Sequence, residues 1–164
     1  MKKKVGIITY HSAYNFGSVL QAYATQWILE KLDCEAVILN YRMKSQYEYY
    51  SMLHTNQGIK VFVKDLLHLP QIKKYIKRKN RFEEFIASLK LTNEFSEPNE
   101  TNIFRDKFDI FVSGSDQIWN KHSNELNSVD WNYMDPYLLD FTDRKKISYA
   151  SSIVNMTQDE LKRI

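Results

Sequence analysis

The feature that most constrains the fold is a strand, a helix and a second strand that follow one another near the N-terminus. Residues 4–9 are apolar and rich in β-branched side chains, the composition of a buried strand. Residues 19–32 carry apolar side chains at intervals of three and four, which predicts a core-facing helix with Ser18 as its N-cap. Residues 35–41 form a second predicted strand. A βαβ unit of this kind implies a parallel sheet with a right-handed crossover.

The later part of the chain continues the α/β pattern. Residues 108–112 predict a third, buried strand, and a fourth strand begins at Lys145 and decays into small residues. Helical spacing appears over residues 58–69 and again over 71–89, whereas 42–55 and 90–102 are expected to be loops, the second followed by a short helical turn. The sequence TQDE has the spacing of a capping box, so a further helix is expected to begin at Thr157.

Bulk properties narrow the class of protein. A chain of 164 residues supports one domain with its own core, so residues 1–164 are expected to form a single domain. The net charge of +3 is too small to imply nucleic-acid binding by itself. The single cysteine, Cys34, allows no disulfide framework and no metal-ligand spacing. No segment resembles a signal peptide or a membrane span, and we expect a cytoplasmic protein.

Two polar loops follow predicted strands and are the predicted functional site. One loop precedes the first helix, and the other is the segment VSGSDQIWN at residues 112–120. Ligands of open α/β sheets bind beyond the carboxyl ends of strands, so the two loops are expected to share one crevice. The expected substrate-binding residues are Asn15, Gly17, Ser18, Gln21, Ser113, Gly114, Ser115, Gln117, Trp119 and Asn120.

Asp116 and His11 are the candidate catalytic residues. Asp116 offers a carboxylate as a base or as an acceptor for hydroxyl groups, and its alternative role is the N-cap of a short turn. His11 offers an imidazole for acid–base work, or it is a loop histidine satisfied by the backbone. Trp119 can stack on a sugar ring or anchor the packing, and Gln21 can bind a sugar hydroxyl or cap the backbone.

The motifs of several common sites are missing. The first loop has one glycine and is neither a G-x-G-x-x-G fingerprint nor a P-loop, which argues against a dinucleotide site. The helix N-terminus that follows it can still attract an anion. The four histidines are scattered, and no cofactor or metal is expected. A basic run on the helix over 71–89 is either a solvated face or a contact for a phosphorylated or membrane-bound substrate.

Several segments together resemble the polysaccharide pyruvyl transferase family. They are GIITYH at residues 6–11, NFGSVLQAYA at 15–24, ILNY at 38–41, FVSGSDQIWN at 111–120, YLLDF at 137–141 and KISYAS at 146–151. The match spans almost the whole chain in order, and the segments at 15–24 and 111–120 are the most specific.

The resemblance implies transfer of a pyruvyl group from phosphoenolpyruvate to sugar hydroxyls. The product would be a pyruvate ketal on a surface polysaccharide or its lipid-linked precursor. The resemblance also implies a Rossmann-like parallel sheet flanked by helices, like the N-terminal half of the two-domain glycosyltransferase B architecture. This chain would be the acceptor side, and the phosphoenolpyruvate site and most catalytic groups would belong to a C-terminal half that the chain lacks.

Other functions stay open at the level of sequence. The chain could be a non-catalytic Rossmann-like module that binds sugar or a partner subunit. A glycosyltransferase that uses a nucleotide-sugar is a third hypothesis, for which the sequence has no nucleotide fingerprint. An apolar face left exposed by a missing half would favour self-association.

Overall fold

Four short strands form one parallel sheet, as the βαβ pattern predicts. The computed structural model describes residues 1–51, 69–115 and 117–162. The strands are paired in the order β2-β1-β3-β4, and every pair is parallel. They are β1 (Lys3–Ile8), β2 (Cys34–Ile38), β3 (Ile110–Ser113) and β4 (Lys145–Ser148).

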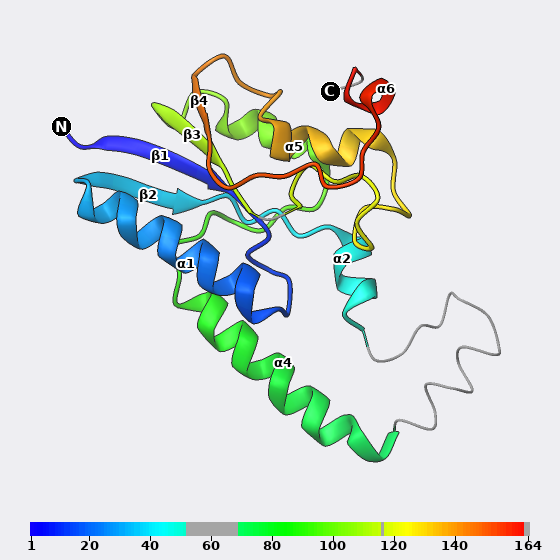
Figure 1. Cartoon of the computed structure of the whole chain (residues 1–164). Helices are drawn as coiled ribbons and strands as arrows, with labels where there is room; N and C mark the ends of the chain where they lie inside the picture. The colour runs from blue at the N-terminus through cyan, green and yellow to red at the C-terminus, as the bar shows by residue number, and fades with distance from the viewer. Residues whose placement is uncertain (52–68, 116, 163–164) are drawn as a thin grey trace.

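Helices cover both faces of the sheet, with α1 and α4 on one side and α5 on the other (Figure 1). The predicted helices over 19–32 and 71–89 are confirmed as α1 and α4, whereas the helix predicted over 58–69 lies outside the described residues. Part of the predicted loop over 42–55 is a helix, α2, so that prediction is wrong there. The helices are α1 (Phe16–Lys31), α2 (Lys44–Tyr49), α4 (Ile72–Ala87), α5 (Asp135–Leu138) and α6 (Gln158–Leu161), with short 3₁₀ turns at η1 (Leu69–Gln71), η2 (Pro98–Phe104) and η3 (Trp131–Met134).

The alternation of side chains along β1 divides the core into two layers. Val5 and Ile7 pack with Ala22 of α1 and Val112 of β3 on one face. On the other face, Gly6 leaves room for aromatic rings, because a Cβ there would lie 3.0 Å from the ring of Phe111. That larger layer also contains aromatic and aliphatic side chains of η2, η3 and α5: Phe104, Met134, Tyr137 and Leu139.

Helix α1 turns a different face to the sheet from the one that its apolar spacing predicts. Leu20, Tyr23, Trp27, Ile28 and Leu32 are 45–67% exposed. Val19 of the predicted stripe is buried, and the other buried positions are Ala22, Thr25 and Gln26. Because α1 is apolar around most of its circumference, spacing alone does not single out one face.

Buried Gln26 explains the orientation of α1. Its side-chain amide donates to the backbone oxygens of Ala36 and Lys90, and its Oε1 accepts from the backbone N–H of Lys90. A buried amide needs such partners, since leaving them unmade costs about 1–3 kcal/mol. Thr25 satisfies its hydroxyl on the backbone oxygen of Gln21 within the helix. Ala22 is fully buried against Val5 and Ile7 of β1, and its small side chain permits close approach of α1 to the sheet.

The chain after α4 runs beside β2. Residues 90–95, predicted as a loop, exchange backbone hydrogen bonds with residues 38–42, and parallel bridges link Ile38 to Leu91 and Tyr41 to Phe95. This segment covers the outer edge of β2. At the opposite end of the sheet, every residue of β4 is exposed, and its two lysines are typical of a protected edge strand.

The predicted capping box at the end of the described chain is confirmed. Thr157 accepts from the backbone N–H of Glu160, and the carboxylate of Glu160 accepts from the N–H of Thr157. In the described parts of the chain, we find no helix with both the length and the apolar character needed to span a bilayer.

Candidate functional site

The two polar loops lie at the point where the chain changes direction across the sheet. From β1 the chain crosses to β2 on one side, and it later returns to β3 on the other side of β1. Ile8 pairs with Ser113, and the N–H of Gly114 donates to the backbone oxygen of Ile8 at 3.2 Å. Both loops therefore leave the same edge of the sheet, and the predicted shared crevice stays a prediction. Such switch points are where open α/β sheets bind ligands.

Gly114 is needed because the segment after β4 passes very close to it. A Cβ at this position would lie 2.5 Å from the backbone oxygen of Tyr149. The approach is held by Ser113, whose backbone oxygen accepts from the N–H of Tyr149 at 2.9 Å and from the Ser151 hydroxyl at 3.3 Å. The loop after β3 is thus supported by the chain that leaves β4.

The turn at residues 117–120 is held by a buried side chain and by hydrogen bonds to the segment after β4. Gln117 has a positive φ of 57° and is exposed, while the next residue, Ile118, is fully buried in the core. Ser152 accepts from the N–H of Gln117 through its hydroxyl and from the N–H of Trp119 through its backbone oxygen. Asn120 donates to Gln117 Oε1 and accepts from the N–H of His122. Asn120 therefore orders the loop.

Trp119 has the contacts of a packing anchor. Its indole Nε1 donates to the backbone oxygen of Tyr137 at 3.0 Å. The same oxygen accepts from the buried hydroxyl of Ser113 at 2.5 Å. The indole is half-buried, so its exposed part is available for stacking, while its polar atom is already used.

The loop after β1 ends in an N-cap that differs from the predicted one. Asn15, and not Ser18, caps α1: its Oδ1 accepts from the N–H groups of Gly17 at 2.8 Å and Ser18 at 3.4 Å. The asparagine side chain reaches both groups from its extended backbone, as preferred N-caps do. These two N–H groups are therefore partly satisfied before any anion arrives. Gln21 is half-buried one turn further along.

His11 is fully buried in a polar network. Its Nε2 lies 2.9 Å from Asn40 Oδ1, and its Nδ1 lies 3.2 Å from the backbone oxygen of Thr9. Arg42 Nε also donates to Asn40 Oδ1 at 3.0 Å, and because a guanidinium only donates, this contact assigns the amide oxygen to that side. We assign the His11 proton to Nε2, which lies closer to its acceptor. Both facing oxygens accept, so the neutral ring donates to Asn40 only and leaves Nδ1 facing the Thr9 oxygen. The ring is fully buried and out of reach of a substrate in this conformation.

Burial lowers the pKa of His11 below its usual 6.5. The unfolded state therefore takes up a proton below pH 6.5 that the native state does not, and stability falls as the pH decreases from there. The expected slope is about 1.4 kcal/mol per pH unit. Urea unfolding at pH 7.5 and 5.0 should show this loss, and His11→Gln should reduce it. The exposed His122→Gln is the control; an equal effect of both substitutions would contradict the assignment.

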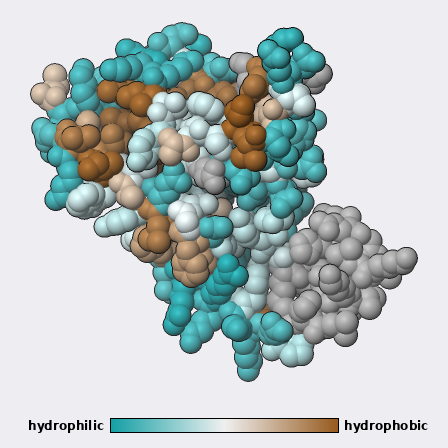
Figure 2. All heavy atoms as spheres, in the orientation of Figure 1, coloured by the Kyte–Doolittle hydropathy of each residue, from teal (hydrophilic) through white to brown (hydrophobic). Residues whose placement is uncertain are grey.

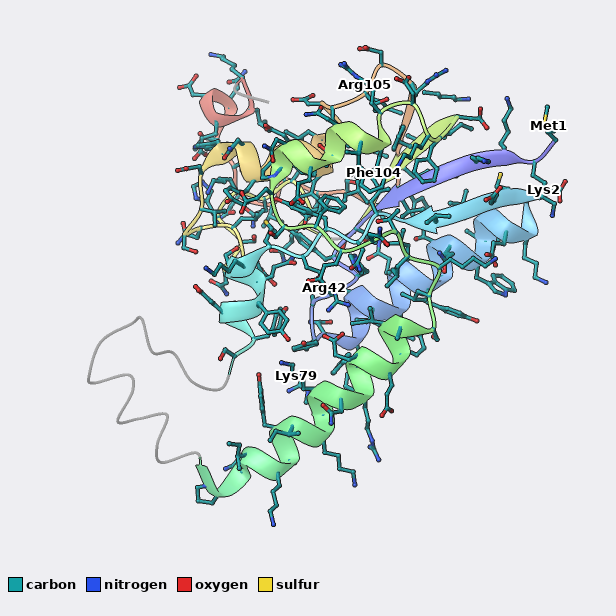
Figure 3. All side chains as sticks on the ribbon, turned by 180° about the vertical axis from the view of Figure 1, so that it is seen from behind. Met1, Lys2, Arg42, Lys79, Phe104 and Arg105 are labelled. Carbon is teal, nitrogen blue, oxygen red and sulfur yellow. The ribbon has the colours of Figure 1, made fainter. Side chains whose placement is uncertain are left out.

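The network continues to a partly buried ion pair that links three elements. Arg42 Nη1 donates to both carboxylate oxygens of Glu83 on α4 at 3.0 Å, and Figure 3 shows Arg42 between the sheet and α4. The Tyr14 hydroxyl of the β1 loop donates to Glu83 at 2.6 Å. Burial, then the hydrogen bond to Glu83, raises the pKa of Tyr14. The loops after β1 and β2 are therefore locked to α4.

The predicted site residues differ in their exposure to solvent. Asp116 lies outside the described residues. No cluster of three or more histidine, cysteine, aspartate or glutamate side chains suited to a metal occurs among the residues that the structure describes. The predicted substrate-binding residues are exposed at Asn15, Gly17 and Gln117, half-buried at Ser18, Gln21 and Trp119, and buried at Ser113, Gly114, Ser115 and Asn120.

The sequence model of the polysaccharide pyruvyl transferase family matches residues 15–164. The chain belongs to this family. The match begins at the end of the loop after β1 and covers α1, β3 and the loop after β3, so it includes both of the most specific segments of the family resemblance, residues 15–24 and 111–120. No curated protein and no solved structure matches this chain.

Sequence reasoning missed residues that support the site from other elements. Asn40 and Arg42 follow β2. Polar residues directly after a strand are the pattern that predicts a site at the other two loops, so this pattern could also have indicated Asn40 and Arg42. Ser151 and Ser152 follow β4 and brace the β3 loop. The sequence around Glu83 does not indicate its role, because an acidic residue on an amphipathic helix is usually exposed to solvent.

Proposed function

We propose that this domain binds the saccharide acceptor of a pyruvyl transfer reaction. In this reaction, a pyruvyl group moves from phosphoenolpyruvate to sugar hydroxyls and forms a pyruvate ketal, in the synthesis of a surface polysaccharide. The observation that carries the proposal is the family match over residues 15–164, which begins at the N-cap of α1 and includes the polar loop after β3 at the switch point of a parallel sheet.

The exposed polar side chains of the two loops suit a sugar. Gln117 projects from a turn fixed by buried neighbours, and Trp119 offers part of a flat indole surface beside it. Gln21 and Ser18 stand at the start of α1. Amide and hydroxyl groups beside an aromatic ring are suited to hydroxyl groups and to the apolar face of a pyranose. We propose Asp116 as the carboxylate that accepts the acceptor's hydroxyl proton, with His11 as a positioning residue.

The donor phosphate requires cations from elsewhere. The described residues of the loops after β1 and β3 include no arginine. Lys121, which follows the second loop, is buried and donates to the backbone oxygens of Leu126 and Val129. Arg42 is occupied by Glu83. We therefore propose that phosphoenolpyruvate is held mainly by a second domain, in a two-domain arrangement like that of glycosyltransferase B enzymes.

A non-catalytic module that binds a saccharide or a partner is the second candidate. It is favoured by the same lack of available cations in the described loops. The two functions differ in one result. If phosphoenolpyruvate and an acceptor saccharide yield a ketal and free phosphate with this chain, alone or with a second domain added, the protein is catalytic.

Thermal unfolding with separate ligands tests the acceptor role. A ligand at a hundred times its Kd stabilises the native state by about 2.7 kcal/mol. We expect a rise in Tm with acceptor saccharides and none with phosphoenolpyruvate alone. Gln21→Ala and Gln117→Asn should weaken the saccharide effect, and the exposed Gln158→Ala on α6 is the control. A shift with phosphoenolpyruvate alone, or no shift with any saccharide, would contradict the acceptor role.

A further inference from the structure

An open groove lies between the N-terminal turns of α1 and the middle of α4. Its volume is about 600 Å³. The floor is apolar, and the rim carries four basic side chains of α4. The apolar lining is Phe16, Val19, Leu20, Phe82 and Phe85, and the basic lining is Lys74, Lys77, Arg78 and Arg81.

The apolar floor continues along α1 beyond the groove. Phe16, Leu20, Tyr23 and Trp27 recur at intervals of three and four and therefore lie on one side of the helix. They are 69, 54, 45 and 47% exposed. The ring of Tyr23 contacts that of Phe85 with their centres 5.8 Å apart, which joins this stripe to the groove. Figure 2 shows hydrophobic residues gathered over α1 and hydrophilic residues along α4 below it.

The basic rim is more densely charged than its acidic surroundings, although Glu84 of α4 lines a neighbouring hollow with Lys77 and Arg81. Among the residues that the structure describes, no carboxylate forms an ion pair with Lys74, Lys77 or Arg81. The guanidinium of Arg78 lies over the ring of Phe82 and donates to the backbone oxygen of Tyr14. Positive charge is thus concentrated directly beside exposed aromatic and aliphatic surface.

We propose that this surface, formed by the α1 stripe and the basic rim of α4, docks on an anionic lipid bilayer. Exposed phenylalanine, leucine and tryptophan side chains favour the boundary between headgroups and acyl chains, and lysine and arginine are attracted to lipid phosphates. An acidic amphipathic helix of a protein partner would need carboxylates in register with the rim. The bilayer matches better, because the apolar stripe extends along α1 past the groove and ends in Tyr23 and Trp27, residues of the membrane interface.

Bilayer binding would place the proposed acceptor-binding domain at a membrane surface. It does not depend on that proposed function. A bilayer contact at α1 would hold the domain on the surface where a lipid-linked saccharide is presented. The polar loops precede α1 and follow β3, so they remain outside the docking surface apart from the first turn of the helix.

Co-flotation with vesicles tests the proposal directly. We expect binding to vesicles that combine phosphatidylcholine with phosphatidylglycerol, and little binding to phosphatidylcholine alone. Each basic residue near an anionic surface is expected to change the partition coefficient about fivefold. The variant K74Q/K77Q/R81Q should therefore lose on the order of a hundredfold, whereas K145Q/K146Q on β4 removes similar exposed charge and should lose much less.

The apolar stripe is tested separately. Leu20→Ser and Trp27→Ser should each weaken vesicle binding while leaving Tm in solution nearly unchanged, because both side chains are already exposed. A blue shift of tryptophan emission on vesicles should disappear in Trp27→Phe. Equal binding to neutral and anionic vesicles, or no effect of either set of variants, would overturn the proposal. So would a dimer in solution that dissociates in Leu20→Ser, since a second copy would then cover the stripe.

Discussion

Gly114→Ala is expected to destabilise the domain by about 3 kcal/mol, a large fraction of the stability of a small domain. The added methyl group would lie 2.5 Å from the backbone oxygen of Tyr149, a distance that only backbone movement can relieve. That movement would break the hydrogen bonds of Ser113 to Tyr149 and Ser151 and displace the loop that carries Gln117. Urea unfolding measures the loss, and saccharide-dependent stabilisation should disappear with it.

Gly17→Ala is the matched control for this substitution. The same methyl group at Gly17 would lie 3.2 Å from a side-chain atom of exposed Asn15, and position 17 is within a helix, where alanine is preferred over glycine. We expect a change within about 1 kcal/mol in either direction. If Gly114→Ala were as mild as Gly17→Ala, the segment after β4 would not brace the loop as the structure indicates.

Glu83→Ala is expected to cost about 3 kcal/mol, because it leaves a charged guanidinium without its carboxylate partner. The Arg42 side chain is only 12% exposed, and its remaining acidic contact, Glu94, is 63% exposed at 3.4 Å. The substitution also removes the acceptor of the Tyr14 hydroxyl. Asp106→Ala, which breaks the exposed pair with Arg144, should cost less than about 1 kcal/mol.

A double variant distinguishes the stability lost with the ion pair from the stability lost by leaving Arg42 without an acidic partner. Arg42→Met combined with Glu83→Met removes both charges and keeps apolar bulk, so it should be more stable than Glu83→Ala alone. Urea unfolding of the single and double variants gives the comparison. A double variant less stable than Glu83→Ala would mean that the pair itself stabilises the domain more than apolar packing does.

The strands, their parallel pairing and the positions of the two polar loops were predictable from the sequence. Apolar runs of strand length and polar loops directly after them are local signals, and both loops prove to lie at the carboxyl edge of neighbouring strands. The spacing also predicts α4 well, since its apolar stripe is narrow and its other faces are charged. The capping box at Thr157 is a short-range signal of the same kind.

The orientation of α1 and the polar network depend on partners far away in sequence. Gln26 is buried because the backbone oxygens of Ala36 and Lys90 accept from its side chain, and the sequence of the helix does not indicate those partners. Asn15 competes with Ser18 for the N-cap, and both residue types are good caps. The positive φ of Gln117 and of Ala150 is imposed by tertiary contacts, because neither residue type favours that conformation.

The two ends of the sheet are not equivalent. Residues 90–95 already pair along the outer side of β2, whereas β4 ends the sheet on the opposite side and is followed at once by the residues that touch Gly114. A strand that joined the sheet beside β4 would therefore shift or stiffen the chain at Tyr149 and, through that contact, the loop that bears the candidate site. The position of Tyr149 thus links this end of the sheet to the loop after β3.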